Sequence, residues 1–136
     1  MTDTFSRQKR RWLMSRVRRE NTEPELLTGQ ALRSLGYRYR LHDNDLPGSP
    51  DIVLPRRRVA ILVHGCFWHG HGCAHGLRRP ASNVAFWRNK LARNRTRDRR
   101  VVRQLRGLGW RVVIVWECQT RTKERLSNCL RRALGK

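Results

Sequence analysis

Apolar residues recur at helical spacing in several stretches of the chain, with polar residues between them. Residues 6–20, within an N-terminal segment 1–20, are dense in arginine, and we expect them to form a basic helical arm. Thr22 and Glu25 then have the spacing of a capping box and Gly36 follows the last apolar position, which predicts a helix between them. Two further helices are predicted downstream, a long polar one over 82–107 and an amphipathic one over 122–134.

Shorter stretches have the composition of β-strands. Residues 51–54 and 59–64 are rich in β-branched side chains, and the short turn between them predicts a hairpin. Residues 110–116 give the strongest strand pattern in the chain, whereas tyrosines alternating with arginines over 37–41 predict a half-exposed strand. The order of these elements predicts a single α/β domain over residues 1–136, in which helices flank a small mixed β-sheet.

The charge of the chain indicates a polyanionic partner. Its 136 residues include 31 lysines and arginines against 10 acidic residues, a net charge of +21 that exceeds what solubility requires. The longest apolar runs are too short to cross a bilayer, and the N-terminus lacks the apolar centre of a signal peptide. We therefore expect a cytoplasmic, nucleoid-associated protein that binds nucleic acid and no membrane, and that acts as a monomer.

The loop over residues 65–80 is rich in glycine, histidine and cysteine. With a cysteine just after the last predicted strand, it supplies four soft donors, Cys66, His71, Cys73 and Cys118. Zinc prefers four thiolate or imidazole ligands in a tetrahedron, so this set predicts a structural zinc site. His69 and His75 are rival ligands, and the alternative is that the cysteines are buried small hydrophobic residues. Cys129 lies on the apolar face of the last predicted helix and is interpreted as a core residue.

A second group of residues combines acids with histidines. Asp51 opens a predicted buried strand, which places a carboxylate at the edge of the sheet, where a hard cation could bind. Glu25, His64 and His69 add the carboxylate and imidazoles that magnesium-assisted phosphodiester hydrolysis uses to hold metal and activate water. Each has a plainer interpretation. Asp51 could be a turn residue and Glu25 could complete a capping box. His64 could be a hydrogen-bonded strand residue, and His69 could be a zinc ligand or a solvated loop residue.

Three motifs along the chain match one known pattern. They are PGSPD over residues 47–51, HGCFWHGHGC over 64–73 and GWRVVIVWEC over 109–118. These motifs resemble the very-short-patch mismatch repair endonucleases, the Vsr family, and the similarity extends over about residues 10–118. The resemblance implies a restriction-endonuclease-like fold and an enzyme that nicks double-stranded DNA beside the thymine of a T·G mismatch left by deamination of 5-methylcytosine. It also implies functional links to a cytosine-5 DNA methyltransferase and a mismatch-repair matchmaker protein.

The same resemblance implies a role for each acid and histidine. Asp51 is expected to bind Mg²⁺, aided by the backbone carbonyl of Val63, which stands where the family often has threonine. His69 is expected to activate the attacking water, with Glu25 and His64 as supporting partners. The resemblance assigns structural Zn²⁺ to the four donors Cys66, His71, Cys73 and Cys118.

An aromatic wedge that enters the base stack beside the mismatch is also implied, consisting of Phe67, Trp68 and Trp87. Met14 in the basic arm is expected to approach from the other groove, and Lys90 and Asn94 are candidate readers of the flanking bases. Opening a base step costs least at a mismatch, and stacked rings return part of that cost. The alternative is that Phe67 and Trp68 form a small satellite core under the loop.

Two other functions compete with mismatch nicking. A zinc-stabilised nucleic-acid-binding protein without catalysis explains the charge and the cysteines, but it has no use for Asp51, Glu25, His64 and His69. A restriction-type endonuclease uses those residues, but it must cut both strands of an intact site.

Overall fold

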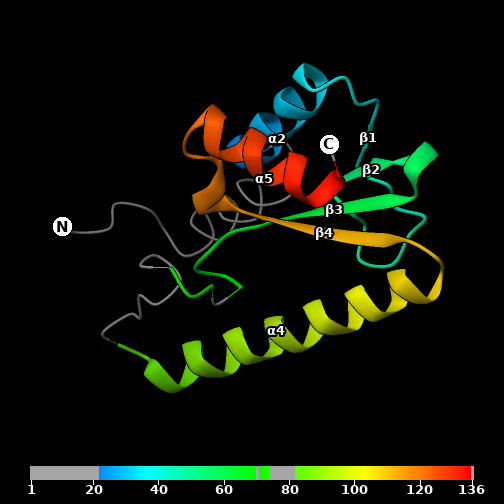
Figure 1. The fold of residues 1–136 in the computed structure, drawn as a ribbon. Helices are drawn as coiled ribbons and strands as arrows, with labels where there is room; N and C mark the ends of the chain where they lie inside the picture. The colour runs from blue at the N-terminus through cyan, green and yellow to red at the C-terminus, as the bar shows by residue number, and fades with distance from the viewer. Residues whose placement is uncertain (1–21, 70, 74–81, 136) are drawn as a thin grey trace, which may run out of the picture.

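The computed structural model describes residues 22–69, 71–73 and 82–135. Within them, three α-helices surround a four-stranded sheet (Figure 1). The helices are α2 (Glu23–Ser34), α4 (Val84–Gly107) and α5 (Lys123–Leu134). The strands are β1 (Arg40–Leu41), β2 (Ile52–Leu54), β3 (Val59–His64) and β4 (Arg111–Trp116), and short 3-10 turns at Pro55–Arg57 and Glu117–Thr120 follow β2 and β4. The predicted basic arm lies outside the described residues.

The sheet is mixed, as predicted. Its strands lie in the order β1-β2-β3-β4; β2 is antiparallel to both β1 and β3, and β4 is parallel to β3. β2 and β3 form the predicted hairpin, whereas the long helix α4 carries the chain back along the sheet so that β4 can run parallel to β3. The parallel register ends on the pair His64 and Trp116. The C-terminal ends of β3 and β4 therefore lie side by side.

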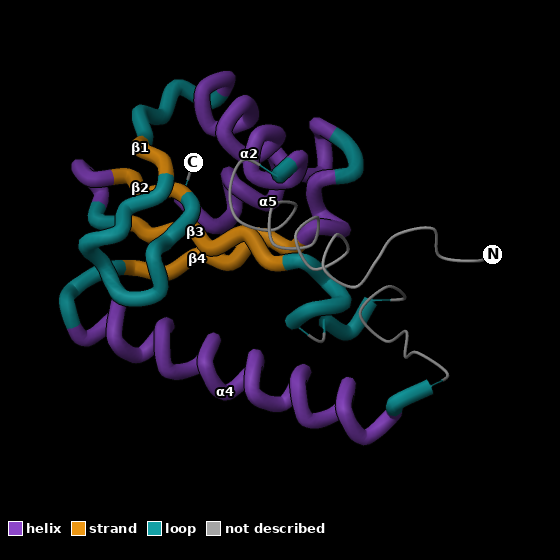
Figure 2. Tube along the Cα trace, turned by 180° about the vertical axis from the view of Figure 1, so that it is seen from behind, coloured by secondary structure: helices purple, strands orange, loops and turns teal. Residues whose placement is uncertain are grey.

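Helices cover both faces of this sheet. α2 and α5 lie on one face and α4 on the other (Figures 1 and 2). The larger core, under α2 and α5, consists of Leu32, Ile52, Leu54, Val59, Ile61, Val113, Val115, Leu126, Leu130 and Leu134. A smaller core of Val53, Ala60 and Leu105 packs under α4. Because side chains alternate along a strand, His64 points to the same face as Ala60, toward α4.

Two local predictions near α2 are corrected by the structure. Thr22 is the N-cap residue but its side chain makes no capping hydrogen bond, so the predicted capping box is wrong. The carboxylate of Glu25 instead pairs with His42. The predicted strand over 37–41 is reduced to β1, because Tyr37 and Tyr39 pack against the larger core, where their rings gain more from burial than an edge strand would provide.

The remaining helices follow the sequence pattern closely. α4 begins two residues later than predicted, at Val84, and only Leu91 and Leu105 of this helix are buried. Most of its other residues are polar or charged. α5 buries Leu126, Leu130 and Leu134, whereas Cys129, interpreted above as a core residue, is only half-buried.

Candidate active site and metal centre

The acids and histidines predicted to act together line one cleft of about 1140 Å³. Glu25 comes from α2, Asp51 from the residue before β2, His64 from the end of β3, and His69 from the loop that follows. Val63, Phe67, Trp68, Lys90 and Asn94 line the same cleft. The structure thus brings together most of the candidate catalytic and DNA-binding residues singled out in the sequence, whereas Met14 and His75 fall outside the described residues.

Asp51 is fixed at the start of β2 by a backbone contact. Its Oδ2 accepts a hydrogen bond of 2.7 Å from the amide of Val63. Burial raises the pKa of Asp51 to about 7, although the Val63 hydrogen bond acts in the opposite direction, and the neighbouring Glu25 carboxylate raises this pKa further. The two carboxylates thus lie close together in a partly buried space, where the charge of one disfavours ionisation of the other. Oxygen donors whose charges repel in this way fit a hard divalent cation such as Mg²⁺.

Glu25 has a partner that the sequence did not reveal. Its side chain is buried, with 7% exposure, and its Oε2 lies 3.1 Å from Nε2 of His42. The backbone amide of His42 also donates to the carbonyl of Asp51 over 2.9 Å. His42 therefore ties both acids to the turn that follows β1.

The histidines His64 and His69 are stacked face to face. Their ring centroids are 3.8 Å apart and their planes differ by 5°. Burial, and then the charge of His69, lower the pKa of His64 to about 4. The imidazole of His64 is consequently neutral at physiological pH, which allows it to lie directly against the ring of His69.

His69 is oriented by Asp98, an acid that sequence reasoning missed. Nδ1 of His69 lies 2.6 Å from Oδ2 of Asp98. Burial alone would raise the pKa of Asp98, but the hydrogen bond and charge of His69 outweigh burial and lower it. An ionised carboxylate can only accept, so Nδ1 carries the hydrogen and Nε2 is the basic nitrogen of the ring. One feature of the sequence could have indicated Asp98: it is the single acidic residue of α4, a helix that is rich in arginine.

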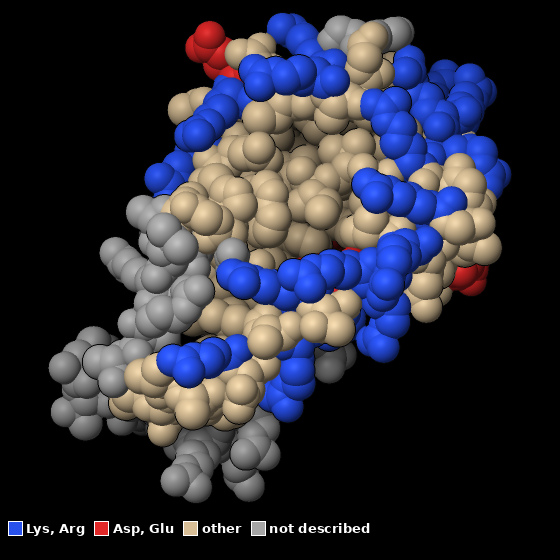
Figure 3. All heavy atoms as spheres, turned by 60° about the horizontal axis from the view of Figure 1, so that its bottom comes forward, with Lys and Arg blue, Asp and Glu red and all other residues tan. Residues whose placement is uncertain are grey.

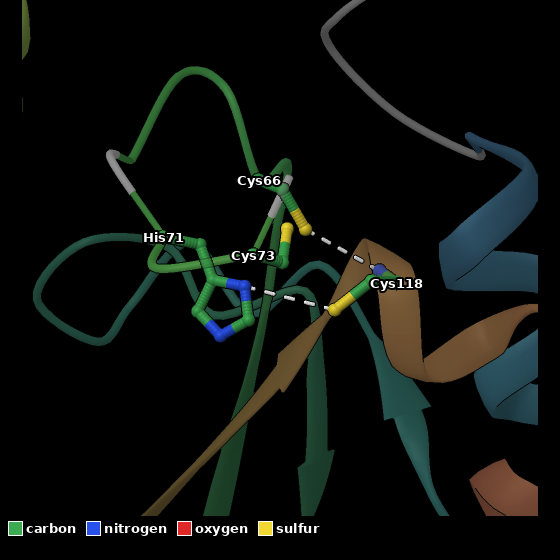
Figure 4. A group of neighbouring side chains, drawn as sticks. All are labelled: Cys66, His71, Cys73 and Cys118. Atoms are coloured by element: carbon green, nitrogen blue, oxygen red, sulfur yellow. Dashed lines mark hydrogen bonds between the residues drawn. The ribbon is translucent and has the colours of Figure 1, made fainter. Parts of the chain in front are cut away.

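The four predicted soft donors converge at the neighbouring ends of β3 and β4 (Figure 4). One donor atom from each of these residues, Cys66, His71, Cys73 and Cys118, lies within 4.8 Å of those of the others. The amide of Cys118 donates to Sγ of Cys66 over 3.3 Å, and Sγ of Cys118 lies 3.6 Å from Nδ1 of His71. We call this group the Cys/His cluster.

The chemistry of the Cys/His cluster suits a soft cation. Burial raises the pKa of the Cys66 thiol to about 12, so a thiolate there requires a nearby positive charge. Three sulfurs and one imidazole are the donors that zinc prefers, and four protein ligands close the coordination sphere. His69, a rival ligand in the sequence, hydrogen bonds to Asp98 instead, and His75 lies outside the described residues.

Aromatic rings gather at one side of the cleft. Phe67, Trp68 and Trp87 contact one another, with ring centroids 5.1 to 5.6 Å apart. The Lys90 ammonium lies 5.5 Å from the Trp68 ring. Asn94, expected to read bases, donates from Nδ2 to the backbone carbonyl of Trp68 over 2.9 Å and so supports this loop.

The surface beside the cleft is strongly basic. Figure 3 shows lysine and arginine side chains spread over the face that α4 presents, with few acidic side chains among them. The arginines of this helix are Arg88, Arg93, Arg95, Arg97, Arg99, Arg100, Arg103 and Arg106. Such a surface attracts a phosphate backbone. No helix in the described ranges has the length and apolar character needed to span a membrane.

Comparisons with known proteins identify the family of the chain. The profile of the family described as DNA mismatch endonuclease Vsr matches residues 2–75. The type II nicking enzyme V.XorIIP of Xanthomonas oryzae pv. oryzae is 52% identical over 119 residues, covering 88% of this chain and 87% of that protein. The DNA mismatch endonuclease Vsr of Escherichia coli is 47% identical over 103 residues, 76% of this chain and 62% of that protein. The chain belongs to the family of Vsr DNA mismatch endonucleases.

Proposed function

We propose that this protein is a Mg²⁺-dependent DNA endonuclease that nicks one strand beside the thymine of a T·G mismatch. The observation that carries the proposal is the cleft that is lined both by the acids Asp51 and Glu25 and by the hydrogen-bonded pair of His69 and Asp98. The names of the relatives, nicking enzymes and a mismatch endonuclease, support the strand-nicking reaction. A protein that only binds nucleic acid has no use for such a cleft.

Asp51 is the residue placed to hold Mg²⁺, together with the backbone carbonyl of Val63. A cation there would neutralise the charge that develops on the scissile phosphate. Glu25 supplies a second carboxylate beside Asp51, and His42 holds it in place. Because Val63 takes part through its backbone, a valine serves at this position as well as a threonine.

His69 is the residue placed to accept a proton from the attacking water. Asp98 keeps the hydrogen on Nδ1, so Nε2 can take the water proton as the water oxygen bonds to phosphorus and the bond to the leaving oxygen breaks. The imidazolium so formed is stabilised by the Asp98 carboxylate. His64 stays neutral and holds the ring of His69 from its stacked face.

Recognition of the substrate falls to the basic surface and the aromatic rings. Phe67, Trp68 and Trp87 form a cluster that can stack against bases at an opened step. Met14 is proposed to enter from the opposite groove, and Lys90, which lies beside Trp68, is proposed to read the flanking bases. Zn²⁺ in the Cys/His cluster would hold the loop that carries two of these rings.

Several broader features are part of the same proposal. We propose a restriction-endonuclease-like fold, a monomer, and a cytoplasmic, nucleoid-associated location. A cytosine-5 DNA methyltransferase and a mismatch-repair matchmaker protein are its proposed functional partners.

A nicking assay tests the reaction directly. End-labelled duplexes that differ only in one T·G or T·A pair are incubated with and without Mg²⁺, and denaturing and native gels separate nicked from linear product. We expect a nick in one strand of the T·G duplex only, and only with Mg²⁺. Linear product from the T·A duplex would favour a restriction-type enzyme, and binding without any cleavage would reject the endonuclease.

A further inference from the structure

Trp116 lies between the Cys/His cluster and the catalytic histidines. Its ring stacks on His71 of the cluster, with centroids 4.2 Å apart and planes 18° apart. The same ring meets His64 at 5.3 Å and His69 at 6.4 Å, in both cases nearly at right angles. One indole thus contacts three histidines that belong to two different sites.

Backbone contacts fix the position of Trp116. Trp116 is the last residue of β4 and pairs in register with His64 at the end of β3. Its amide donates to Oε1 of Gln119 over 2.9 Å, and Cys118, two residues further on, belongs to the Cys/His cluster. The backbone that carries the ring is therefore held both by the sheet and by the turn that follows it.

The histidine pair, by contrast, has few polar restraints. Nδ1 of His64 is buried and has no hydrogen-bond partner within the described residues. The orientation of His64 therefore depends on its aromatic contacts, which are the stacked ring of His69 and the edge-on ring of Trp116. His69 has Asp98 at one nitrogen, but a hydrogen bond at one atom leaves the ring able to swing about it.

We infer that Trp116 is a positioning residue for the nicking reaction. Its indole holds the stacked pair His64 and His69 in the orientation that directs His69 toward the scissile phosphate. Because the same ring stacks on His71, it also links the position of this pair to the Cys/His cluster. The inference rests on the proposed nuclease function. Among the described residues, Trp116 is not part of the cleft lining, and its ring contacts are with histidines rather than with the DNA-binding rings. Loss of the indole should therefore reduce the rate of the chemical step and leave DNA affinity intact.

Two substitutions of Trp116 distinguish a role in positioning the histidines from a general role in stabilising the fold. Trp116→Leu removes the ring, whereas Trp116→Phe keeps an aromatic face. Trp110→Leu is the matched control, because Trp110 precedes the other end of β4 and lies under Arg58 rather than near the histidines. Each variant is assayed for single-turnover nicking of the T·G duplex, for DNA affinity and for zinc content.

We expect Trp116→Leu to lower the single-turnover rate by about 10- to 100-fold, with DNA affinity and zinc content equal to those of the wild type. Trp116→Phe should stay within about threefold of the wild-type rate, and Trp110→Leu should keep the wild-type rate at a temperature where it is folded. A wild-type rate in Trp116→Leu would overturn the inference, as would equal losses in Trp116→Leu and Trp116→Phe. If Trp116→Leu lost zinc in parallel with the nicking rate, the indole would have a purely structural role and the inference would be rejected.

A spectroscopic measurement keeps this inference distinct from the proposed function. The indole ring current should shift the ring-proton resonances of His64 and His69, and Trp116→Leu should move both, while Trp110→Leu should leave them in place. Unmoved resonances would reject the positioning contact even if the rate fell. If the wild-type protein nicks no duplex at all, the proposed function fails, and these resonances still report whether Trp116 orients the pair.

Discussion

The ring of His69 and the carboxylate of Asp98 are joined by a hydrogen bond of 2.6 Å that connects the loop after β3 to the middle of α4. Both side chains are less than one fifth exposed. The carboxylate decides which ring nitrogen carries the hydrogen and also stabilises the ring once it has accepted a second proton. The nicking rate should therefore depend on the charge of Asp98.

Asp98→Asn should lower the single-turnover nicking rate by about 100-fold or more, which is the usual contribution of a general base. The amide can still bond to the ring, but it brings no negative charge and can favour the wrong tautomer. DNA affinity should remain near that of the wild type. Glu124→Gln, an exposed acid of α5, changes the net charge by the same amount and is the control. A rate unchanged by Asp98→Asn would remove the pair from the mechanism.

Asp51 should make the requirement for Mg²⁺ depend on pH. Its pKa, raised mainly by burial to about 7 without a cation, means that Mg²⁺ must displace a proton at lower pH. The Mg²⁺ concentration for half-maximal nicking should therefore fall as pH rises from about 6 to about 8. Titrations of Mg²⁺ at several pH values measure this directly. A midpoint that does not move with pH would place the cation on other ligands.

The same carboxyl gives a stability prediction with a definite sign. Because its folded pKa lies above the ordinary value of 3.8, Asp51 stabilises the fold below that value, and the contribution is lost as pH rises through about 7. Without added Mg²⁺, Asp51→Asn should gain in Tm relative to the wild type as pH rises over this window. His64 acts in the opposite sense, since its contribution is present above 6.5 and is lost as pH falls toward about 4, but it is common to both proteins and cancels in the difference.

The Cys/His cluster predicts a coupled loss of metal and stability. Cys73→Ser removes one of four converging donors and should lower both zinc content and Tm, the latter by about 5 °C or more. Cys129→Ser is the matched control, because Cys129 is also half-buried but stands outside the cluster. Zinc content by metal analysis and Tm by calorimetry are the two readouts. Full zinc content in Cys73→Ser would exclude this residue as a ligand.

Much of this architecture was predictable because its signals are local. The hairpin of β2 and β3, the strand β4 and the helix α5 each follow from a continuous hydrophobic pattern, and α4 follows from a long polar stretch with sparse apolar positions. Three of the four donors of the Cys/His cluster lie within eight residues of sequence, from Cys66 to Cys73. Cys118 could be added because it follows a strand whose end could return to that loop.

The parts that escaped prediction depend on long-range packing. Asp98 meets a partner 29 residues away and His42 one 17 residues away, and no periodicity indicates either contact. The same applies to Trp116, which was interpreted only as part of a strand. The capping box predicted from Thr22 and Glu25 was wrong for the opposite reason. The local pattern was present, but Glu25 is buried and pairs with His42, a partner distant in the sequence.

The aromatic cluster beside the cleft leads to a prediction about discrimination between duplexes. Trp68 contacts both Phe67 and Trp87 and lies next to Lys90, and we expect its ring to stack on a base at an opened step. Stacking of one base on a ring contributes about 1–3 kcal/mol, and an opened step costs less at a mismatch. Trp68→Ala should therefore lower affinity for the T·G duplex by about tenfold and affinity for the T·A duplex by much less.

A neighbouring ring supplies the control for this experiment. Phe86→Ala removes a side chain that is 52% exposed and touches Trp87 but lies outside the cleft lining, so the ratio of the two affinities should stay close to that of the wild type. Binding titrations with fluorescent duplexes in a Mg²⁺-free buffer measure both affinities without cleavage. Equal losses on both duplexes in Trp68→Ala would mean that the ring serves as a small satellite core under the loop, because a packing defect weakens every DNA contact alike, whereas a stacking ring acts where the bases come apart.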